Sequence, residues 1–446
     1  MVDNVLLITI DSLRMDIWRD MIPSLPAGRE LEDTGVSFER AFATGPGTTS
    51  SFPALLTGTY PLSHGGLGPL DPSRPRVASL LQDEGLLTGG FHSNPFLSTN
   101  FHYDVGFDEF VDYQHPLMGI ATRVFPRGIE LNNPVMQKID NVVDVTGAIK
   151  STYQLVSGRP RPYVPASVIT DDSIDWIGTT DRPFFCWAHY MDVHHPCHPP
   201  EPYRDAFGVS DVSMNHVADL YEQMINRPET LSGNDREVLL ALYRAAITYV
   251  DEEIQRLIAM LKEEDLYDDT LIVLTSDHGE LFGEHGCYGK PARMFDELLH
   301  VPLVIVNGSS ELESANQSLV SLLDVPPLYH HTRGRACSAE YEGVDLDTES
   351  REYVIAEHAV RGDPVIGVRS DEWLYEIDEI HRERRLFDLQ TDQEVDPKRT
   401  RSDENARLVR EVAVERLQAI DPAAVSEADL TLGDDVEERL AHLGYR

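Results

Sequence analysis

Two acidic residues in this chain each end a short apolar run, and the second is followed directly by a histidine. Asp11 follows the run 5–10, and Asp277 and His278 follow the run 271–276. A carboxylate and an imidazole at a strand end can both reach one divalent cation, since both are common metal ligands. The glycines that come next let the backbone turn closely around such a centre. The pattern therefore predicts a metal site formed by Asp11, Asp277 and His278.

Apolar runs of this type are typical of buried parallel strands whose carboxyl ends open onto a ligand site. Two further runs, Phe184 to His189 and Val301 to Val306, have the same character. Helical patterns lie between the runs, at 51–56, at 77–84 and from about 235 to 264. This alternation predicts an α/β fold in which helices sandwich a mostly parallel sheet.

The periodicity and composition of the sequence change at two places along the chain. Residues 112–165 have weak periodicity with several prolines and glycines, which indicates an insertion near the site. Whether this insertion acts as a lid over the site is left open by the sequence. From 351 to 446 we expect a small α+β subdomain, with four short strands at hairpin spacing and then a helix from about 405 to 420. Residues 1–350 form the predicted catalytic domain.

Composition limits the partners of the protein. The net charge is -39 over 446 residues, and such an acidic surface repels nucleic acid and anionic membranes. A solvated acidic surface suited to high salt, as in the acidic proteome of a halophilic archaeon, would explain this charge. The four cysteines include no CxxC pair, which argues against a disulfide scaffold or a structural zinc site. The first apolar run is too short for a membrane span or a signal sequence, so we expect a cytoplasmic protein.

Several separated blocks of the sequence resemble the sulfatase family of the alkaline-phosphatase superfamily. They are Ile10-Asp11-Ser12-Leu13-Arg14, Tyr249-Val250-Asp251, the TSDHGExxGEHGxxxK run from Thr275 to Lys290, His300-Val301-Pro302-Leu303, Ser321-Leu322-Leu323-Asp324, Leu386-Phe387-Asp388-Leu389 and Leu443-Gly444-Tyr445. The resemblance implies an alkaline-phosphatase-like α/β core with a small C-terminal subdomain. It also implies one or two divalent metal ions (Ca, Mg, Mn or Zn) beside a nucleophile.

The resemblance places the nucleophile at Thr48, ten residues before the Gly58 that ends a Leu-Leu-Thr-Gly block. Sulfatases carry Cys or Ser there, within C/S-x-P-x-R, and oxidise it to formylglycine, whereas Phe52 replaces the Arg in this chain. Threonine is the nucleophile of superfamily relatives that handle phosphate esters. A hydroxyl bound to a metal at the start of a helix is activated, because the metal ion lowers its pKa and the helix N-terminus favours the anion that forms. Alternatively, Thr48 only caps a helix that begins near Ser50 or Ser51, and these serines are the fallback nucleophiles.

Three further residues match anion-handling positions of the family. His194 lies in a D-x-H-x-P block, where a histidine contacts the leaving-group oxygen or the transferred anion and can donate a proton. Lys290 matches the lysine that neutralises the bound anion. Asn94 is the best placed residue for binding the anion, because Phe91-His92-Ser93-Asn94 replaces the Gly-Lys-x-His block that grips sulfate. His194 could also hold a second metal together with His195 and His198.

Departures from the family pattern favour phosphoryl over sulfuryl transfer. Ser12 stands where sulfatases have a second metal-binding Asp, and the sulfate-specific groups are missing while the metal ligands remain. We therefore expect a hydrolase or transferase of a phosphate or sulfate ester on a small molecule, a glycan or a lipid. The alternatives are a sulfatase, a non-catalytic metal-binding relative, or a phosphate mutase whose second metal would involve His358.

Overall fold

The computed structural model of the chain describes residues 2–113, 163–391, 393–398, 400, 402–421 and 425. A seven-stranded sheet with the order β2-β11-β7-β1-β6-β4-β5 forms its centre. The strands from β7 to β5 are parallel, and β11 and β2 are antiparallel to their neighbours, so the predicted mostly parallel sheet is confirmed. The bounds are β1 (Asn4–Ile10), β2 (Val36–Ser37), β4 (Leu87–Phe91), β5 (Glu109–Val111), β6 (Phe184–Tyr190), β7 (Thr270–Ser276) and β11 (Leu303–Val306).

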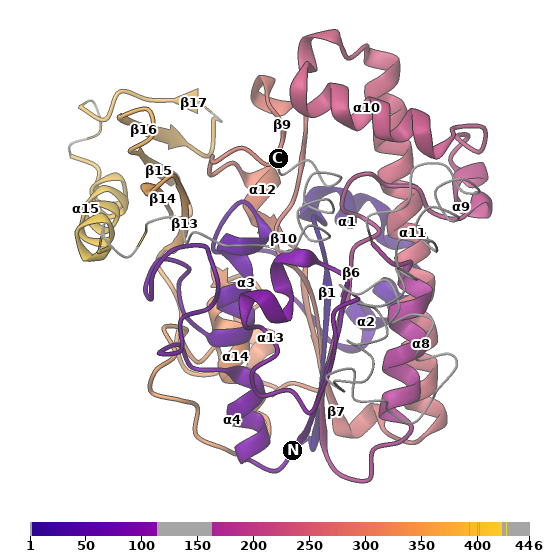
Figure 1. Ribbon diagram of the computed structural model, residues 1–446. Coiled ribbons are helices and arrows are strands. Elements are labelled where there is room, and N and C mark those ends of the chain that lie inside the picture. The colour runs from indigo at the N-terminus through magenta and orange to yellow at the C-terminus, as the bar shows by residue number, and fades with distance from the viewer. Residues whose placement is uncertain are drawn as a thin grey trace, which may run out of the picture.

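Helices cover both faces of this sheet (Figure 1). On one face lie α3 (Thr48–Thr57), α4 (Val77–Asp83) and α14 (Val325–His331), and on the other α2 (Pro26–Thr34), α8 (Ala166–Ile177) and α11 (Gly233–Glu263). The central strands read as continuous apolar runs because both of their faces are covered. In β1, for example, Leu7 belongs to one hydrophobic cluster, and Leu6 and Ile8 belong to the other.

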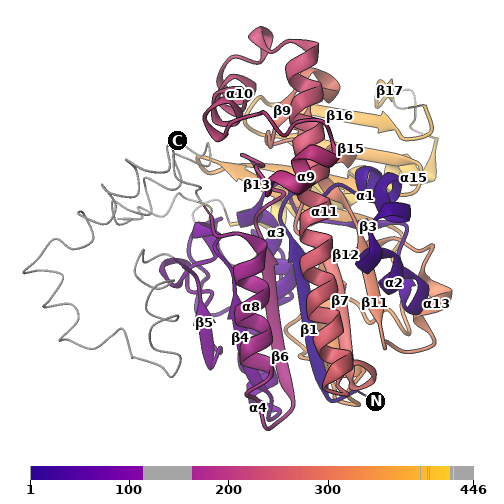
Figure 2. The same ribbon diagram turned by 90° about the vertical axis from the view of Figure 1, so that its right-hand side faces the viewer.

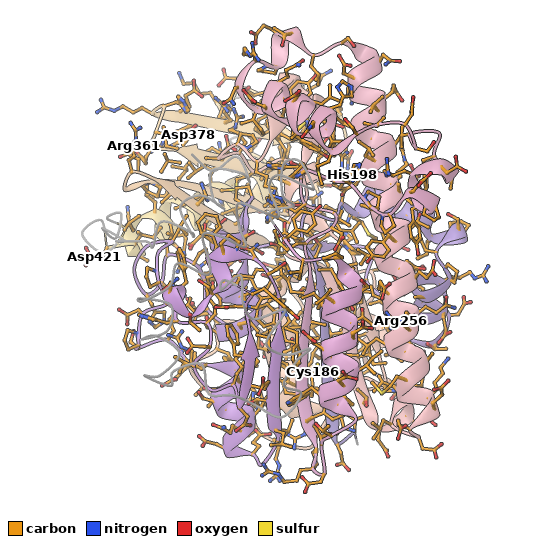
Figure 3. The ribbon with its side chains drawn as sticks, turned by 45° about the vertical axis from the view of Figure 1, so that its right-hand side comes forward. Cys186, His198, Arg256, Arg361, Asp378 and Asp421 are labelled. Atoms are coloured by element: carbon orange, nitrogen blue, oxygen red, sulfur yellow. The ribbon has the colours of Figure 1, made fainter. Side chains whose placement is uncertain are left out.

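The long helix α11 lies beside α8 along the same face of the sheet (Figure 2). Ser232 and Asp235 form a capping box at its N-terminus, which satisfies backbone N–H groups that a helix start leaves open. Farther along, Arg256 of α11, which is labelled in Figure 3, forms an ion pair with Asp171 of α8 at 2.5 Å. The shorter helices are α1 (Met15–Met21), α9 (Glu201–Ala206), α10 (Met214–Asn226), α12 (Asp296–Leu299) and α13 (Leu312–Ala315).

A second, antiparallel sheet follows in the C-terminal part of the chain, with α15 (Glu404–Ala419) packed against it (Figure 1). The four predicted strands and the predicted helix are all present. The strands are β13 (Val354–Val360), β14 (Asp363–Arg369), β15 (Trp373–Asp378) and β16 (Glu383–Asp388), with the short β17 (Gln393–Glu394) added at the edge. The boundary at 350 stays a prediction, and most of the predicted insertion, residues 114–162, lies outside the described residues.

Two expectations about local structure were wrong. The apolar run 301–306 is two strands, β10 (His300–Val301) and β11, because Pro302 has no N–H for a sheet ladder. Helix α3 begins at Thr48, earlier than the expected start at Ser51. Strand β10 joins β3 (Ala41–Phe42) and β12 (Val320–Ser321) in a small sheet, and β8 (Leu281–Phe282) pairs with β9 (Tyr288–Gly289).

The four cysteines lie among the described residues and are free, as expected from their spacing. Within the same part of the chain, none of the helices combines the length and the apolar character needed to cross a membrane.

Asp251 is an acidic residue in the apolar middle of α11, and its hydrogen bonds to another helix account for its position there. Its carboxylate oxygens accept hydrogen bonds from the N–H groups of Ala27 (3.1 Å) and Gly28 (2.8 Å), in the first turn of α2. The residue before α2, Leu25, cannot cap the helix with its side chain. Asp251 therefore caps α2 from a distance and ties it to α11.

We expect Asp251→Ala to lower the free energy of unfolding by about 1–2 kcal/mol, because two buried N–H groups lose their acceptor. Chemical denaturation measures this loss. Gln255→Ala, an exposed position one turn farther along α11, is the control and should change stability by less than about 0.5 kcal/mol. Equal stability of the two variants would contradict the capping role.

Candidate metal centre and nucleophile

The carboxylates of Asp11 and Asp277 lie side by side because the strands that precede them are neighbours. β1 and β7 pair in parallel with Ile10 opposite Ser276. Each strand therefore delivers its next residue to the same level at the carboxyl edge of the sheet, where α/β folds bind ligands. Both side chains are fully buried. Together with His278, they form a group whose ligand atoms all lie within 4.8 Å of one another.

Hydrogen bonds fix which atoms of Asp277 and His278 face the centre of this group. Oδ1 of Asp277 accepts from the backbone N–H groups of Ser12 (3.1 Å) and His278 (2.9 Å). Its Oδ2 faces Nε2 of His278 at 3.3 Å. Nδ1 of His278 lies 2.8 Å from the carbonyl oxygen of Gly279, which can only accept, so Nδ1 carries the proton. Nε2 therefore presents a lone pair, as a metal-binding imidazole must.

Thr48 brings a hydroxyl group to the same centre. Its Oγ1 lies 3.1 Å from Oδ2 of Asp277 and 3.3 Å from Nε2 of His278. The same atom lies 3.4 Å from Oδ2 of Asp11. Helix α3 begins at Thr48 with Gly47 as its N-cap residue, so Thr48 is not the cap of a later helix. The start of α3 directs the hydroxyl at all three predicted metal ligands.

The two fallback nucleophiles are hydrogen-bonded to backbone groups. Oγ of Ser50 donates to the carbonyl oxygen of Gly47 at 2.9 Å. Oγ of Ser51 donates to the carbonyl oxygen of Asp277 at 2.5 Å. Ser51 thereby ties α3 to the loop after β7, and this contact holds Thr48 beside the metal ligands.

Asn94 and Lys290 lie against Asp11. Oδ1 of Asn94 accepts from the N–H of Phe96 (3.0 Å), which orients the amide so that Nδ2 donates to Oδ2 of Asp11 (2.9 Å). Nζ of Lys290 lies 3.9 Å from Oδ1 of Asp11, and the lysine side chain is 7% exposed. Ser12 has a left-handed backbone (φ 65°), and its hydroxyl donates to the same Oδ1 at 2.7 Å. Ser12 thus supports Asp11 from the position where sulfatases have a second Asp.

The loop after β6 contains the other predicted histidines, and each contacts a different partner. Nδ1 of His194 lies 2.6 Å from the carbonyl oxygen of His195. His195 pairs with Glu280, which is fully buried. His198, labelled in Figure 3, directs Nε2 at the carbonyl oxygen of Val212 at 3.2 Å. Within the described part of the chain, these histidines do not form a group with metal-ligand spacing, so the alternative of a second metal here gains no support.

His358, the remaining candidate for a second metal, lies on β13 and also stands outside both groups of metal-ligand spacing found among the described residues. Burial lowers the pKa of His358 to about 4. The second of those groups, His331, Asp345 and Asp347, is partly exposed and contains none of the predicted site residues.

Burial and repulsion make the two central carboxylates unequal. Burial, followed by the charge of Asp11, raises the pKa of Asp277 well above its usual value. Burial also opposes ionisation of Asp11, but His194 and Lys290 help to hold its pKa well below the usual range. Burial lowers the pKa of His278 to about 4, so its imidazole is neutral at physiological pH. Two buried carboxylates this close are both ionised only when a nearby cation compensates their charges, and otherwise Asp277 holds a proton.

The donor set fits such a cation. Two carboxylate oxygens, a hydroxyl oxygen and one imidazole nitrogen converge at one point, and ions such as Ca, Mg, Mn and Zn bind ligands of these types. The residues that would hold the ion are Asp11, Thr48, Asp277 and His278.

The sequence argument did not single out two buried residues near this centre. His189 is the second-last residue of β6, and its Nε2 lies 3.4 Å from Oδ2 of Asp11. Glu280 belongs to the TSDHGE run and holds His195. The signal for His189 was its place near the carboxyl end of a predicted strand, the same signal that identified Asp11.

Comparisons with known proteins show the family and the fold of the chain. A family model described as Sulfatase matches residues 3–329. An arylsulfatase of Clostridium perfringens is 24% identical over 428 residues, which cover 87% of this chain and 88% of the relative. PehA of Trinickia caryophylli, a multifunctional alkaline phosphatase superfamily protein, is 26% identical over 361 residues, 68% of each chain. The solved structure of a phosphonate monoester hydrolase from Silicibacter pomeroyi superposes with a TM-score of 0.67 at 21% identity, over 94% of this chain and 96% of that one.

We expect Asp277→Asn to stabilise the metal-free protein by about 1 kcal/mol and to abolish stabilisation by divalent cations. An amide would keep Oδ1 on the two backbone N–H groups and would donate from Nδ2 to the hydroxyl of Thr48. Wild type should gain about 2.7 kcal/mol at a metal concentration of 100 times Kd. Thermal unfolding with a chelator and with added Ca, Mg, Mn or Zn measures both effects.

Asp11→Asn is the matched control. Both oxygens of Asp11 face donors, so an amide nitrogen would meet a donor, and this variant should be less stable than wild type without metal. A metal-dependent gain in Asp277→Asn equal to that of wild type would contradict the assigned centre.

Proposed function

The chain belongs to the sulfatase family, and we propose that it is a metal-dependent hydrolase or transferase of phosphate esters with Thr48 as the nucleophile. The observation that carries this proposal is the position of the Thr48 hydroxyl, within 3.4 Å of all three metal-ligand side chains. Members of the family act on esters of strong oxyacids, and the relatives named above include both a sulfatase and a phosphonate monoester hydrolase.

A divalent cation held by Asp11, Asp277, His278 and Thr48 would lower the pKa of the threonine hydroxyl and offset the charge of the ester. The chain itself orients this hydroxyl. Thr48 stands at the N-terminus of α3, where the helix dipole and open N–H groups favour an oxyanion. Its Oγ1 gives its proton to water and attacks phosphorus, forming a phosphothreonine while the bond from phosphorus to the leaving oxygen breaks.

Lys290 and Asn94 provide the donors for the transferred group. Lys290 is nearly buried, so its ammonium acts on the equatorial oxygens through little solvent. The amide nitrogen of Asn94 has two hydrogens, and one of them is used by Asp11. The second is available to an oxygen of the substrate. This geometry supports the substrate-binding roles that the sequence predicted for both residues.

His194 is the proposed general acid. Because Nδ1 donates to a carbonyl oxygen, Nε2 is the atom that exchanges a proton with the leaving oxygen. Burial and then the charge of Lys290 lower the pKa of His194 well below its usual value. A bound dianion raises that pKa again, since an opposite charge favours the imidazolium. After the alcohol leaves, neutral His194 takes a proton from the water or acceptor hydroxyl that cleaves the phosphothreonine.

Phe52 supports phosphate over sulfate as the transferred group. It occupies the place of the arginine of the sulfatase motif, is fully buried, and packs edge-on against His189 with ring centroids 5.0 Å apart. A cationic side chain is therefore missing at that position. The similarity to an arylsulfatase favours sulfate ester hydrolysis as the second candidate, which would need Thr48 to act without formylglycine or a modified Ser50 or Ser51.

Parallel turnover assays distinguish the two candidates. With a divalent metal present, we expect 4-nitrophenyl phosphate or its phosphodiester analogue to be hydrolysed faster than 4-nitrophenyl sulfate. Thr48→Ala should lower kcat by about 10³-fold or more, because the covalent step is lost. Thr49→Ala, at the adjacent half-buried threonine, is the control and should retain activity. Faster turnover of the sulfate ester, or full activity of Thr48→Ala, would overturn the proposal.

The dependence on the leaving group tests His194 separately. His194→Ala should lower kcat/KM by about 10²–10⁴-fold for an alkyl phosphate, whose alkoxide must be protonated as it departs. For 4-nitrophenyl phosphate, whose phenolate leaves without a proton, the loss should be much smaller. His198→Ala, in the same loop, is the control for both substrates. Equal losses for the alkyl and nitrophenyl esters would contradict the acid role.

A further inference from the structure

A line of polar side chains lies buried beneath Asp11, and none of them has a part in the proposed reaction. Thr9 of β1 and His189 of β6 are direct neighbours in the parallel pairing of these strands. Trp187 stands two residues before His189 and therefore on the same face of β6. All three side chains are fully buried. Polar groups in such a place are costly unless their hydrogen bonds serve a purpose or compensate one another.

The direction of these hydrogen bonds follows from the chemistry of each group. Nε1 of Trp187 can only donate, and it donates to Oγ1 of Thr9 at 2.9 Å. Oγ1 of Thr9 lies 2.9 Å from Nδ1 of His189, and among the described residues this nitrogen is the acceptor that the threonine hydrogen reaches. With Nδ1 as the acceptor, the ring hydrogen of the His189 tautomer lies on Nε2.

Nε2 of His189 is the atom that faces Oδ2 of Asp11, at 3.4 Å. Within the part of the chain that the structure describes, this nitrogen makes no hydrogen bond of standard geometry. The N–H of His189 therefore has one carboxylate oxygen in front of it. Asn94 donates to that same oxygen, and Ser12 donates to the other one. The carboxylate of Asp11 is thus surrounded by donors on the sides that face the protein.

We propose that His189 is a positioning residue for Asp11, and that Trp187 and Thr9 set its tautomer so that Nε2–H points at the carboxylate. This inference rests on the proposed function, because Asp11 is there a metal ligand. A polar partner that orients a metal-binding carboxylate raises the affinity of the site, and losing such a partner typically weakens metal binding by about 10–100-fold. The other tautomer would turn a lone pair toward Asp11 and repel it.

Two amide substitutions separate the two ring nitrogens of His189. The side-chain amide of Asn ends near the position of Nδ1, whereas that of Gln reaches the position of Nε2. His189→Asn therefore keeps a partner for Thr9 and loses the donor to Asp11, and His189→Gln keeps the donor. We expect calorimetric titration of chelator-treated protein with Mg, Mn, Ca or Zn to show about 10–100-fold weaker binding for His189→Asn. His189→Gln should bind within about threefold of wild type.

A merely structural role predicts a different result, since neither amide reproduces the packing of the aromatic ring and both variants would then bind metal more weakly than wild type. Metal binding by His189→Asn equal to that of wild type, or stronger than that of His189→Gln, would overturn this inference alone. A wild-type protein that binds no divalent cation would overturn the proposed function together with it. The two failures are thus distinguishable in the same titration.

Trp187→Phe provides a second route that keeps His189 and leaves an aromatic ring in the core. The indole N–H occupies one lone pair of the Thr9 oxygen and so keeps the hydroxyl hydrogen away from that side. Without it the hydroxyl turns more freely, its hydrogen is less firmly directed at Nδ1, and the other tautomer of His189 gains population. Nitrogen NMR of the histidine rings should show the Nε2–H form of His189 in wild type and a mixture in Trp187→Phe. A wild-type ring protonated on Nδ1 alone would overturn the assignment.

Discussion

Two fully buried carboxylates on adjacent parallel strands are the constraint on which the rest of the site depends. The register of β1 and β7 puts Asp11 and Asp277 at one level, so their charges cannot be separated without breaking the sheet. Bringing two like charges out of water at this distance is unfavourable. One of the two charges must therefore be offset, either by a proton on Asp277 or by a cation. The groups around the pair (a neutral imidazole, a helix N-terminus and a nearly buried lysine) suit a cation or compensate the charge.

Backbone geometry gives this arrangement its rigidity. Oδ1 of Asp277 is held by two N–H groups, and one of them belongs to Ser12 in the turn that follows β1. The loop after β7 also passes so close to α12 that a Cβ at Gly279 would overlap the backbone oxygen of Glu297. Ser51 anchors α3 to the same loop. Three segments far apart in the sequence thus share one set of contacts, which leaves the hydroxyl of Thr48 little freedom to move away from Asp11, Asp277 and His278.

The sequence predicted the parts of this structure that have strong local signals. Long apolar runs predicted β1, β6 and β7, and the acids that follow β1 and β7 lie in a group with metal-ligand spacing, as predicted. Strand β4 escaped notice because glycines occupy two of its five positions, and β2 and β3 are too short to show periodicity. The sequence argument interpreted Ser12 as the loss of a metal-binding Asp. In the structure its hydroxyl donates to Asp11 and its backbone N–H donates to Asp277. His189 stands at the end of a predicted run, but its contact with Thr9 depends on a pairing register between residues 180 positions apart, which the sequence does not show.

The charge of the whole protein bears on how such a site can work. A net charge of -39 repels an anionic ester. This repulsion decays over the Debye length, which is about 8 Å at physiological ionic strength and about 3 Å at 1 M salt. Attraction to the site must therefore come from groups that the substrate meets at contact. Lys290, Asn94 and a bound cation are such groups, and their burial protects them from the same screening. Added salt then weakens the long-range repulsion more than the binding contacts, which makes an acidic surface compatible with an anionic substrate.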